Sequence, residues 1–346
     1  MATIRDIAAK AGVSASTVSR ILNNDREMHV TEETRERVLN VAEELHYEKT
    51  IRVERQVKSS KTVTGKEDAV ETFTIGILQW FSAEQEMQDD YYLKIRRGIE
   101  DYCGEAGIGI VRSYRSDENY ISLLKDVDGL ICVGKFARDE VNTILYRFHS
   151  VIFLDMQVDY PEVTTLNVDF KKAGRDALHY LESLGHQRIA FLCGREFASG
   201  KEPIEDIRKK TFIEHMKEKG REYESLIKEG AFTTASGYEM MKELLDECDE
   251  IPDAVFAASD AIAIGAMRAI KEQNYSVPES ISVIGINDSE MSAYTAPALT
   301  TVAAPAYDMG QHGANLIYAM AHYRIKTPMK ILLPCHLVIR ESCKER

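Results

Sequence analysis

Apolar residues between positions 3 and 22 recur at helical spacing in two short stretches. The predicted buried faces are Ile4, Ile7, Ala8 and Ala11 in the first stretch, and Val18, Ile21 and Leu22 in the second. Gly12, between the two stretches, can adopt a positive φ without steric strain, and Ser14 is a favourable N-cap for the second helix. The pattern predicts a helix-turn-helix.

A third helix is predicted after Thr31, which is a suitable N-cap. Its apolar stripe is Val38, Val41, Ala42 and Leu45. Three short helices around one core make a domain of residues 1–49, which we call the headpiece. Residues 50–72 are polar and charged, and we interpret them as a linker or hinge.

From Phe73 onward, short apolar runs that suit buried strands alternate with stretches of helical spacing. The predicted strands are 73–78, 109–112, 129–133, 151–155, 188–193, 254–258, 281–285 and 331–338. The predicted helices are 92–106, 170–184, 204–219, 236–245, 260–272 and 307–323. This alternation is typical of an α/β body with parallel sheets covered by helices. Its length predicts two lobes, an N-lobe of about 73–168 and 303–325 and a C-lobe of about 169–302 and 326–346.

The opening turns of the second helix carry small or hydrogen-bonding side chains, which suit a groove of DNA. These are Ala15, Ser16, Thr17, Ser19 and Arg20. A helical hairpin that only packs is the alternative for this spacing alone. The net charge of −13 argues against a nucleic-acid partner. The negative charge is concentrated in the body, however, because residues 1–60 hold ten basic and ten acidic residues. Residues 49–66 hold six basic residues against the single Glu54, and this segment is either a solvated linker or a phosphate contact.

Several classes of protein are disfavoured by the composition. No run of about 18 apolar residues is present, and early charges at Arg5 and Asp6 replace the apolar core of a signal peptide, so we expect a cytoplasmic protein. The six cysteines are scattered and are expected to be reduced. The sequence lacks a Gly-x-Gly-x-x-Gly motif, a P-loop, a Gly-x-Ser-x-Gly elbow and a His-Glu-x-x-His motif. We therefore predict no enzyme, catalytic residue, cofactor or metal.

The headpiece resembles the DNA-binding domain of the lactose-repressor (LacI/GalR) family of bacterial regulators. The matching segments are Asp6-Ile7-Ala8, Val13-Ser14, Thr17-Val18-Ser19-Arg20 and Leu22-Asn23. The body shares Asn167-Val168-Asp169, Leu184-Gly185-His186, Ser259-Asp260 and Ser282-Val283-Ile284-Gly285 with that family. The resemblance implies a body like a periplasmic sugar-binding protein, with an effector between its lobes, and a homodimer that binds operator DNA without any membrane contact.

In such a complex, Arg20 is expected to read a guanine, Ser16 to donate to or accept from a base, and Ala15 to contact a thymine methyl group. Thr17 and Ser19 would contact phosphates. The remaining residues of the predicted DNA-binding set are Thr3, Ser14, Asn23 and Val57. Val57 enters as the candidate minor-groove wedge, because the family's Pro-Asn is replaced by Lys49-Thr50 and Gln56 stands where a leucine is expected.

Polar residues at or just after the ends of predicted strands are candidates for the effector site, because open parallel sheets bind ligands at these ends. They are Asp155, Ser259 and Asn287, and helix capping is the alternative role for such residues. Arg208 aligns with the arginine that family members direct at the effector, and Trp80 with Phe81 offers a flat apolar wall.

The segment from Gln79 to Arg96 resembles a Gram-positive galactose-repressor-like subgroup. This resemblance favours galactose or a β-galactoside as inducer, while another sugar, a purine or a phosphorylated carrier protein remain alternatives. A transport protein that binds sugar is a second alternative for the body alone. A dimer is favoured over a tetramer, since no leucine heptad follows the last predicted strand.

Overall fold

The computed structural model describes residues 4–22, 30–45, 73–87, 89–117, 119–156, 160–198 and 202–346. They fall into an N-terminal unit and a body that begins at residue 72. The predicted hinge and three residues of the predicted DNA-binding set, Thr3, Asn23 and Val57, lie outside the described residues.

The described part of the headpiece contains three helices, α1 (Ile4–Ala11), α2 (Ala15–Leu22) and α3 (Glu32–Glu44). Gly12 has a φ of 68° in the turn between the first two helices. The backbone amide of Thr17 donates to the Ser14 hydroxyl at 3.0 Å, which caps α2 as predicted. The apolar faces meet in one core of Ile7, Ala8, Ala11, Val18, Ile21, Leu22, Val38, Val41 and Ala42. The predicted helix-turn-helix is therefore confirmed.

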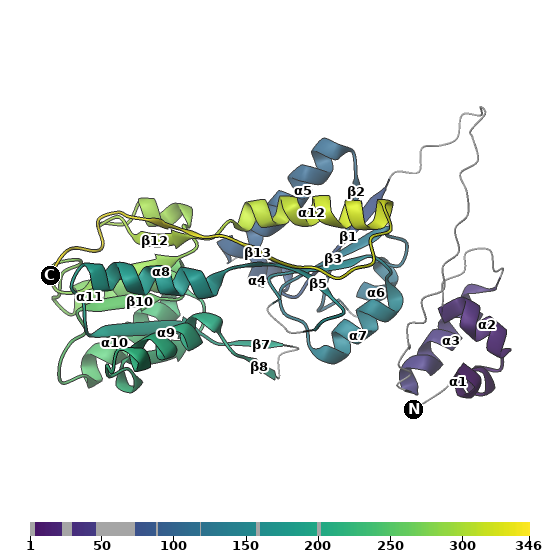
Figure 1. Cartoon of the computed structure of the whole chain (residues 1–346), viewed down its shortest axis with the longest axis horizontal. Helices are drawn as coiled ribbons and strands as arrows, with labels where there is room; N and C mark the ends of the chain where they lie inside the picture. The colour runs from purple at the N-terminus through teal and green to yellow at the C-terminus, as the bar shows by residue number, and fades with distance from the viewer. Residues whose placement is uncertain are drawn as a thin grey trace. The chain divides into compact units, whose positions relative to one another are not determined.

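The N-lobe of the body contains a parallel sheet in the order β13-β5-β4-β3-β1-β2. Its strands are β1 (Thr74–Gln79), β2 (Gly109–Tyr114), β3 (Gly129–Val133), β4 (Val151–Leu154), β5 (Thr164–Val168) and β13 (Lys330–Leu333). The accompanying helices are α4 (Ala83–Met87), α5 (Asp90–Ala106), α6 (Tyr120–Leu123), α7 (Arg138–Arg147) and α12 (Ala306–His322). Figure 1 shows helices on both faces of this sheet. Strands β3 and β4 are buried along their whole length, as expected for central strands of a covered sheet.

The C-lobe repeats this architecture with a sheet in the order β14-β12-β11-β10-β6-β9. Its strands are β6 (Ile189–Gly194), β9 (Ile227–Gly230), β10 (Ala254–Ala257), β11 (Ser282–Ile286), β12 (Thr300–Ala303) and β14 (His336–Val338). Its helices are α8 (Phe170–Ser183), α9 (Ile207–Glu218), α10 (Thr234–Glu247) and α11 (Asp260–Glu272), with short 3₁₀ turns η1 (Glu224–Leu226) and η2 (Glu290–Ala293). Strands β7 (Glu196–Ala198) and β8 (Glu202–Ile204) form a separate antiparallel ribbon.

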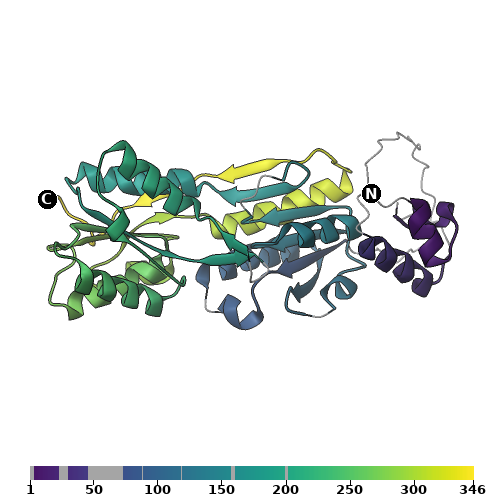
Figure 2. The same ribbon diagram turned by 90° about the horizontal axis from the view of Figure 1, so that it is seen from below.

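The chain crosses between the lobes three times, from β5 to α8, from β12 to α12 and from β13 to β14 (Figure 2). The last crossing corrects two predictions. Residues 331–338 are not one strand, because β13 pairs parallel with β5 in the N-lobe while β14 pairs antiparallel with β12 in the C-lobe. The predicted C-lobe segment 326–346 is therefore divided between the lobes. Pro334, which lacks an amide proton, lies at the break.

Most predicted elements are present with shifted ends. Helix α11 matches its predicted bounds, whereas α9 starts at Ile207 rather than Ile204, because Ile204 pairs with Glu196 in the ribbon. The sequence pattern did not predict the helices α4, α6 and α7 or the strands β5, β7, β8, β9 and β12. Among the described residues all six cysteines are free, as expected.

Each lobe contains one pair of helices whose backbones meet at glycines. In the N-lobe, a Cβ atom on Gly98 of α5 would overlap the carbonyl oxygen of Tyr307 in α12, and one on Gly310 would overlap that of Ile95. In the C-lobe, a Cβ atom on Gly237 of α10 would overlap the carbonyl oxygen of Ile262 in α11, and one on Gly265 of α11 would overlap that of Thr234 in α10. These glycines let the helices approach more closely than any side chain would allow.

We predict that Gly98→Ala destabilises the body. The added methyl group must push α5 away from α12, and overpacking of this kind costs about 1–3 kcal/mol. The measurement is the free energy of unfolding in urea, and the matched control is Gly104→Ala. Gly104 lies on the same helix with open space around it, so alanine there should stabilise by about 0.5–1 kcal/mol. Equal effects of the two substitutions would contradict this account of the packing.

Candidate functional site

Helix α2 presents a polar face beside its buried one. Ala15, Ser16 and Arg20 are exposed, Thr17 and Ser19 are half-buried, and the remaining face of the helix packs into the headpiece core. The Ser14 hydroxyl is within hydrogen-bonding distance of the side chains of Ser16 (2.7 Å) and Thr17 (2.8 Å), besides capping the helix. The buried face thus fixes which residues α2 can offer to a groove, and these are the ones the sequence singled out.

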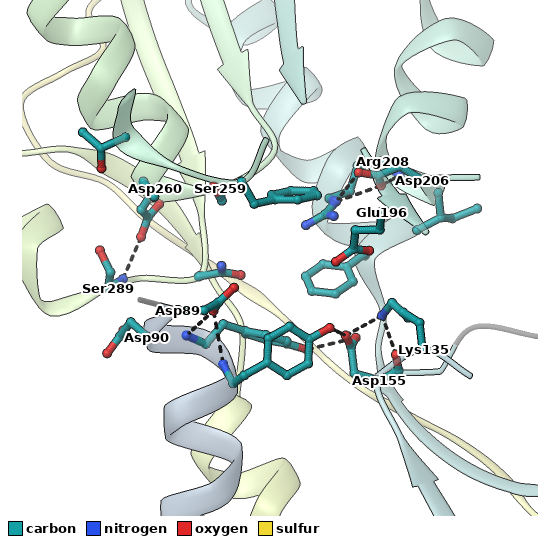
Figure 3. Close-up of a pocket in the computed structure, with 18 of the residues that line it drawn as sticks. Asp89, Asp90, Lys135, Asp155, Glu196, Asp206, Arg208, Ser259, Asp260 and Ser289 are labelled. Atoms are coloured by element: carbon teal, nitrogen blue, oxygen red, sulfur yellow. Dashed lines mark hydrogen bonds and ion pairs between the residues drawn. The ribbon is translucent and has the colours of Figure 1, made fainter. Parts of the chain in front are cut away.

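The body contains a cavity of about 220 Å³ that is lined by both lobes (Figure 3). Its walls come from the segments that follow β4, β10 and β11, and from the beginnings of α5, α9 and α11. The volume lies just below the roughly 300–1,000 Å³ that is common for small-molecule sites. The cavity therefore suits a small ligand.

Asp155 is the centre of the N-lobe wall. It follows β4 with a φ of 59° and is buried. Its carboxylate accepts hydrogen bonds from the hydroxyl groups of Tyr92 (2.6 Å) and Tyr91 (3.2 Å), and it forms an ion pair with Lys135 (Figure 3). Burial and the Asp155 charge raise the pKa of both tyrosines well above the ordinary value, so they remain hydroxyl donors.

Arg208 is the centre of the C-lobe wall. Its Nε donates to both oxygens of Asp206 (2.8 and 3.1 Å), and one terminal nitrogen donates to the Ala258 carbonyl at 2.9 Å. The guanidinium carbon lies 4.8 Å from the ring centroids of both Phe170 and Phe232. Although burial alone would lower the pKa of Arg208, Asp206 raises it above its ordinary value, so the group stays charged. Its remaining N–H groups are available to a ligand.

Asn287 and Ser259 line the cavity from the ends of β11 and β10. Asn287 has a φ of 112°, a strained value for a residue other than glycine, and its buried Oδ1 has no hydrogen-bond partner. The Ser259 hydroxyl accepts from the amide of Ile262 at 3.3 Å and so caps α11. Capping, the alternative role for Ser259, is therefore present in addition to its place in the wall.

Two further carboxylates of the cavity titrate near neutral pH. Burial raises the pKa of Asp89 to about 6, against the lowering effect of hydrogen bonds from the amides of Tyr92 and Tyr91. Burial likewise raises the pKa of Asp260 to about 6, although its carboxylate accepts from Ser292 (2.8 Å) and from two other donors. Both side chains help to make the wall of the cavity negative.

The structure brings together four of the six predicted effector residues, Asp155, Arg208, Ser259 and Asn287. Trp80 and Phe81 do not line this cavity, which corrects the predicted aromatic wall. Trp80 is buried, stacks on Phe81 with a centroid distance of 4.5 Å, and occupies the space left by the missing side chain of Gly134.

The aromatic lining comes from residues that the sequence analysis did not assign to the site. These are Tyr91, Tyr92, Phe170 and Phe232, and Lys135 was missed as well. The pair Tyr91-Tyr92 carried a signal, because it belongs to the segment that resembles the galactose-repressor subgroup. Lys135 lies two residues after the end of β3, with Gly134 between them, whereas Asp155 directly follows β4, so a rule restricted to the first residue after a strand misses Lys135.

Within the described residues, no helix combines the length and the apolar character needed to cross a membrane.

Comparisons with known proteins match both parts of the chain. The pattern of the lacI family of bacterial regulatory proteins matches residues 3–49, and that of the periplasmic binding protein-like domain matches residues 178–343. The transcriptional regulator GalR of Streptococcus thermophilus is 35% identical over 99% of this chain and 100% of its own length. The transcriptional repressor MelR of Bacillus subtilis is 33% identical over 99% of this chain and 98% of its own length.

Two solved structures of transcriptional regulators are similar to this chain over nearly its whole length. A complex of the transcriptional regulator CelR with cellobiose has a TM-score of 0.69 and 27% identity, covering 99% of this chain and 100% of that one. The lac repressor dimer bound to operator and an anti-inducer has a TM-score of 0.69 and 25% identity, covering 99% of both chains. The predicted fold and family are thus confirmed, and the relatives are regulators rather than enzymes. The chain belongs to the lacI family of bacterial regulatory proteins and is a transcriptional regulator that binds DNA through its headpiece.

Proposed function

We propose that this regulator is a cytoplasmic, homodimeric repressor whose operator binding is controlled by a small sugar in the cavity between the lobes. The observation that carries the proposal is the set of side chains gathered there, the carboxylate of Asp155, the guanidinium of Arg208 and the unpartnered amide oxygen of Asn287. Sugar hydroxyl groups donate to the oxygens and accept from the guanidinium. The rings of Phe170 and Phe232 supply apolar contact for the carbon skeleton.

The favoured sugar is galactose or a β-galactoside. Resemblance of the segment around Tyr91-Tyr92 to galactose-type repressors supports this choice, and the cellobiose bound by the structural relative CelR supports a carbohydrate in general. A purine is the alternative, since it could use the same amide, guanidinium and aromatic rings.

Control of DNA binding follows from a ligand that touches both lobes. A sugar that prefers one arrangement of the lobes shifts the population towards that arrangement. One headpiece contacts only a half-site, so a dimer is needed to reach two successive turns of the major groove. The lac repressor dimer on its operator supports the same assembly for this chain. By linkage, the sugar and the operator must alter each other's affinity by the same factor.

The experiment that tests the sugar proposal is a melting-temperature screen of the full chain against neutral sugars and nucleobases. Galactose or a β-galactoside is expected to raise the melting temperature, because a ligand at a hundred times its Kd adds about 2.7 kcal/mol to the free energy of unfolding. A rise with nucleobases alone would show that the effector class is wrong.

We predict that Asn287→Gly lowers sugar affinity without lowering stability. Glycine relieves the strained backbone at φ 112°, while the loss of the amide removes a hydrogen bond to the ligand, for an expected decrease of about tenfold. Titration calorimetry measures the affinity and urea unfolding the stability. Asn274→Gly is the matched control, since Asn274 also has positive φ, at 64°, but lies exposed after α11 outside the cavity. A sugar affinity that is unchanged in Asn287→Gly would remove Asn287 from the site.

For the headpiece, we predict that Arg20→Ala reduces discrimination at one base pair by about 1–3 kcal/mol. Arg20 is exposed on α2, where a guanidinium can reach a guanine edge. Fluorescence anisotropy with single-base variants of an operator selected from random duplexes measures the effect. Lys10→Ala removes one positive charge from α1 instead, and it should weaken all variants equally or not at all. Uniform weakening by Arg20→Ala would show that Arg20 contacts phosphate only.

A further inference from the structure

We propose that Glu196 determines the specificity of the cavity, because its carboxylate accepts hydroxyl hydrogen bonds from an uncharged sugar and excludes anionic ligands. This inference rests on the proposed sugar site and names the ligand class that the site takes. Glu196 was not among the residues that the sequence analysis selected.

The ribbon β7–β8 places Glu196 in the cavity. Strand β7 begins two residues after the end of β6, and its register pairs Glu196 with Ile204, just before the segment that carries Asp206 and Arg208. Figure 3 shows the Glu196 side chain between Arg208 of the C-lobe and Lys135 of the N-lobe. Across the described residues, its carboxylate forms no ion pair and accepts no hydrogen bond from protein. Its two oxygens are therefore open to a ligand.

The cations that face Glu196 already have partners. Arg208 is paired with Asp206 at 2.8 Å, and Lys135 donates to the carboxylate and the backbone carbonyl of Asp155. Asp89 and Asp260 add negative charge to the same cavity. A phosphate or carboxylate on a ligand would meet cations whose charge is already balanced by Asp206 and Asp155, while it approaches the further carboxylates of Glu196, Asp89 and Asp260. Repulsion between like charges is stronger in a site partly shielded from water than in bulk water, and it disfavours an anionic ligand here.

An uncharged polyol is not repelled by these carboxylates and can donate hydrogen bonds to them. Glu196 is half-buried. Burial raises the pKa of its carboxyl group, with Lys135 lowering it and Asp155 raising it, because less water reaches the charged form. Two ligand hydroxyl groups can replace that water by donating to the carboxylate. The same group thus favours a neutral sugar and disfavours an anion.

The test is titration calorimetry of the full chain with galactose and galacturonate, and in parallel with glucose and glucuronate. Wild-type protein should bind a neutral sugar at least about tenfold more tightly than its uronate. Glu196→Gln should lower the affinity for the neutral sugar about tenfold and raise that for the uronate, so that the preference collapses. Glu239→Gln removes the same charge from the exposed surface of α10 in the same lobe, and it should change neither affinity.

The outcomes separate the two proposals. If no neutral sugar and no uronate binds, the proposed sugar function fails and this inference fails with it. If a uronate binds wild-type protein as tightly as the neutral sugar, the sugar site stands and only the role of Glu196 is overturned. Equal loss of both affinities in Glu196→Gln would mean that Glu196 supports the wall without selecting the ligand, which also overturns the proposal.

Discussion

The direction of parallel strands is the constraint on which the ligand site depends. In each lobe the parallel strands end at one edge of the sheet, and the helices that follow them begin there, so residues that end these strands and residues that start helices share one surface. Asp89, Asp206 and Ser259 each cap a helix and also line the cavity. Helix capping and a place in the cavity wall, which compete as interpretations of a sequence, are thus combined in single side chains. The carboxylates satisfy helix amides and leave the wall negative.

Local sequence patterns were sufficient to predict the helices of the headpiece and several of the residues that line the cavity. The helical hairpin depends on residues close in sequence, such as Gly12 at positive φ and the Ser14 cap, and both were predicted. Asp155 and Asn287 were found because a polar residue after a buried run has a defined place in a parallel sheet. Arg208 came from family resemblance alone, because its helix carries several other charges that look equivalent in sequence.

The errors arose where packing between distant segments decides the outcome. Trp80 follows a strand as Asp155 does, yet it turns into the core because Gly134 leaves space for its ring. Tyr91 and Tyr92 line the cavity wall because their hydroxyl groups donate hydrogen bonds to Asp155, which lies more than sixty residues later in the chain. The two strands β13 and β14 read as one apolar run, since nothing local shows that they pair in different lobes. Such information is present in the chain but not in its periodicity.

The chain crossings also determine when each part of the molecule can be completed during synthesis. The headpiece precedes the body and packs its apolar faces into a core of its own, and most of the C-lobe is one continuous segment from α8 to β12, to which the edge strand β14 is added later. The N-lobe must wait, because α12 packs against α5 and β13 completes the sheet beside β5 only when residues beyond 306 have been made. A nascent chain therefore carries a DNA-reading helix long before it has a finished cavity.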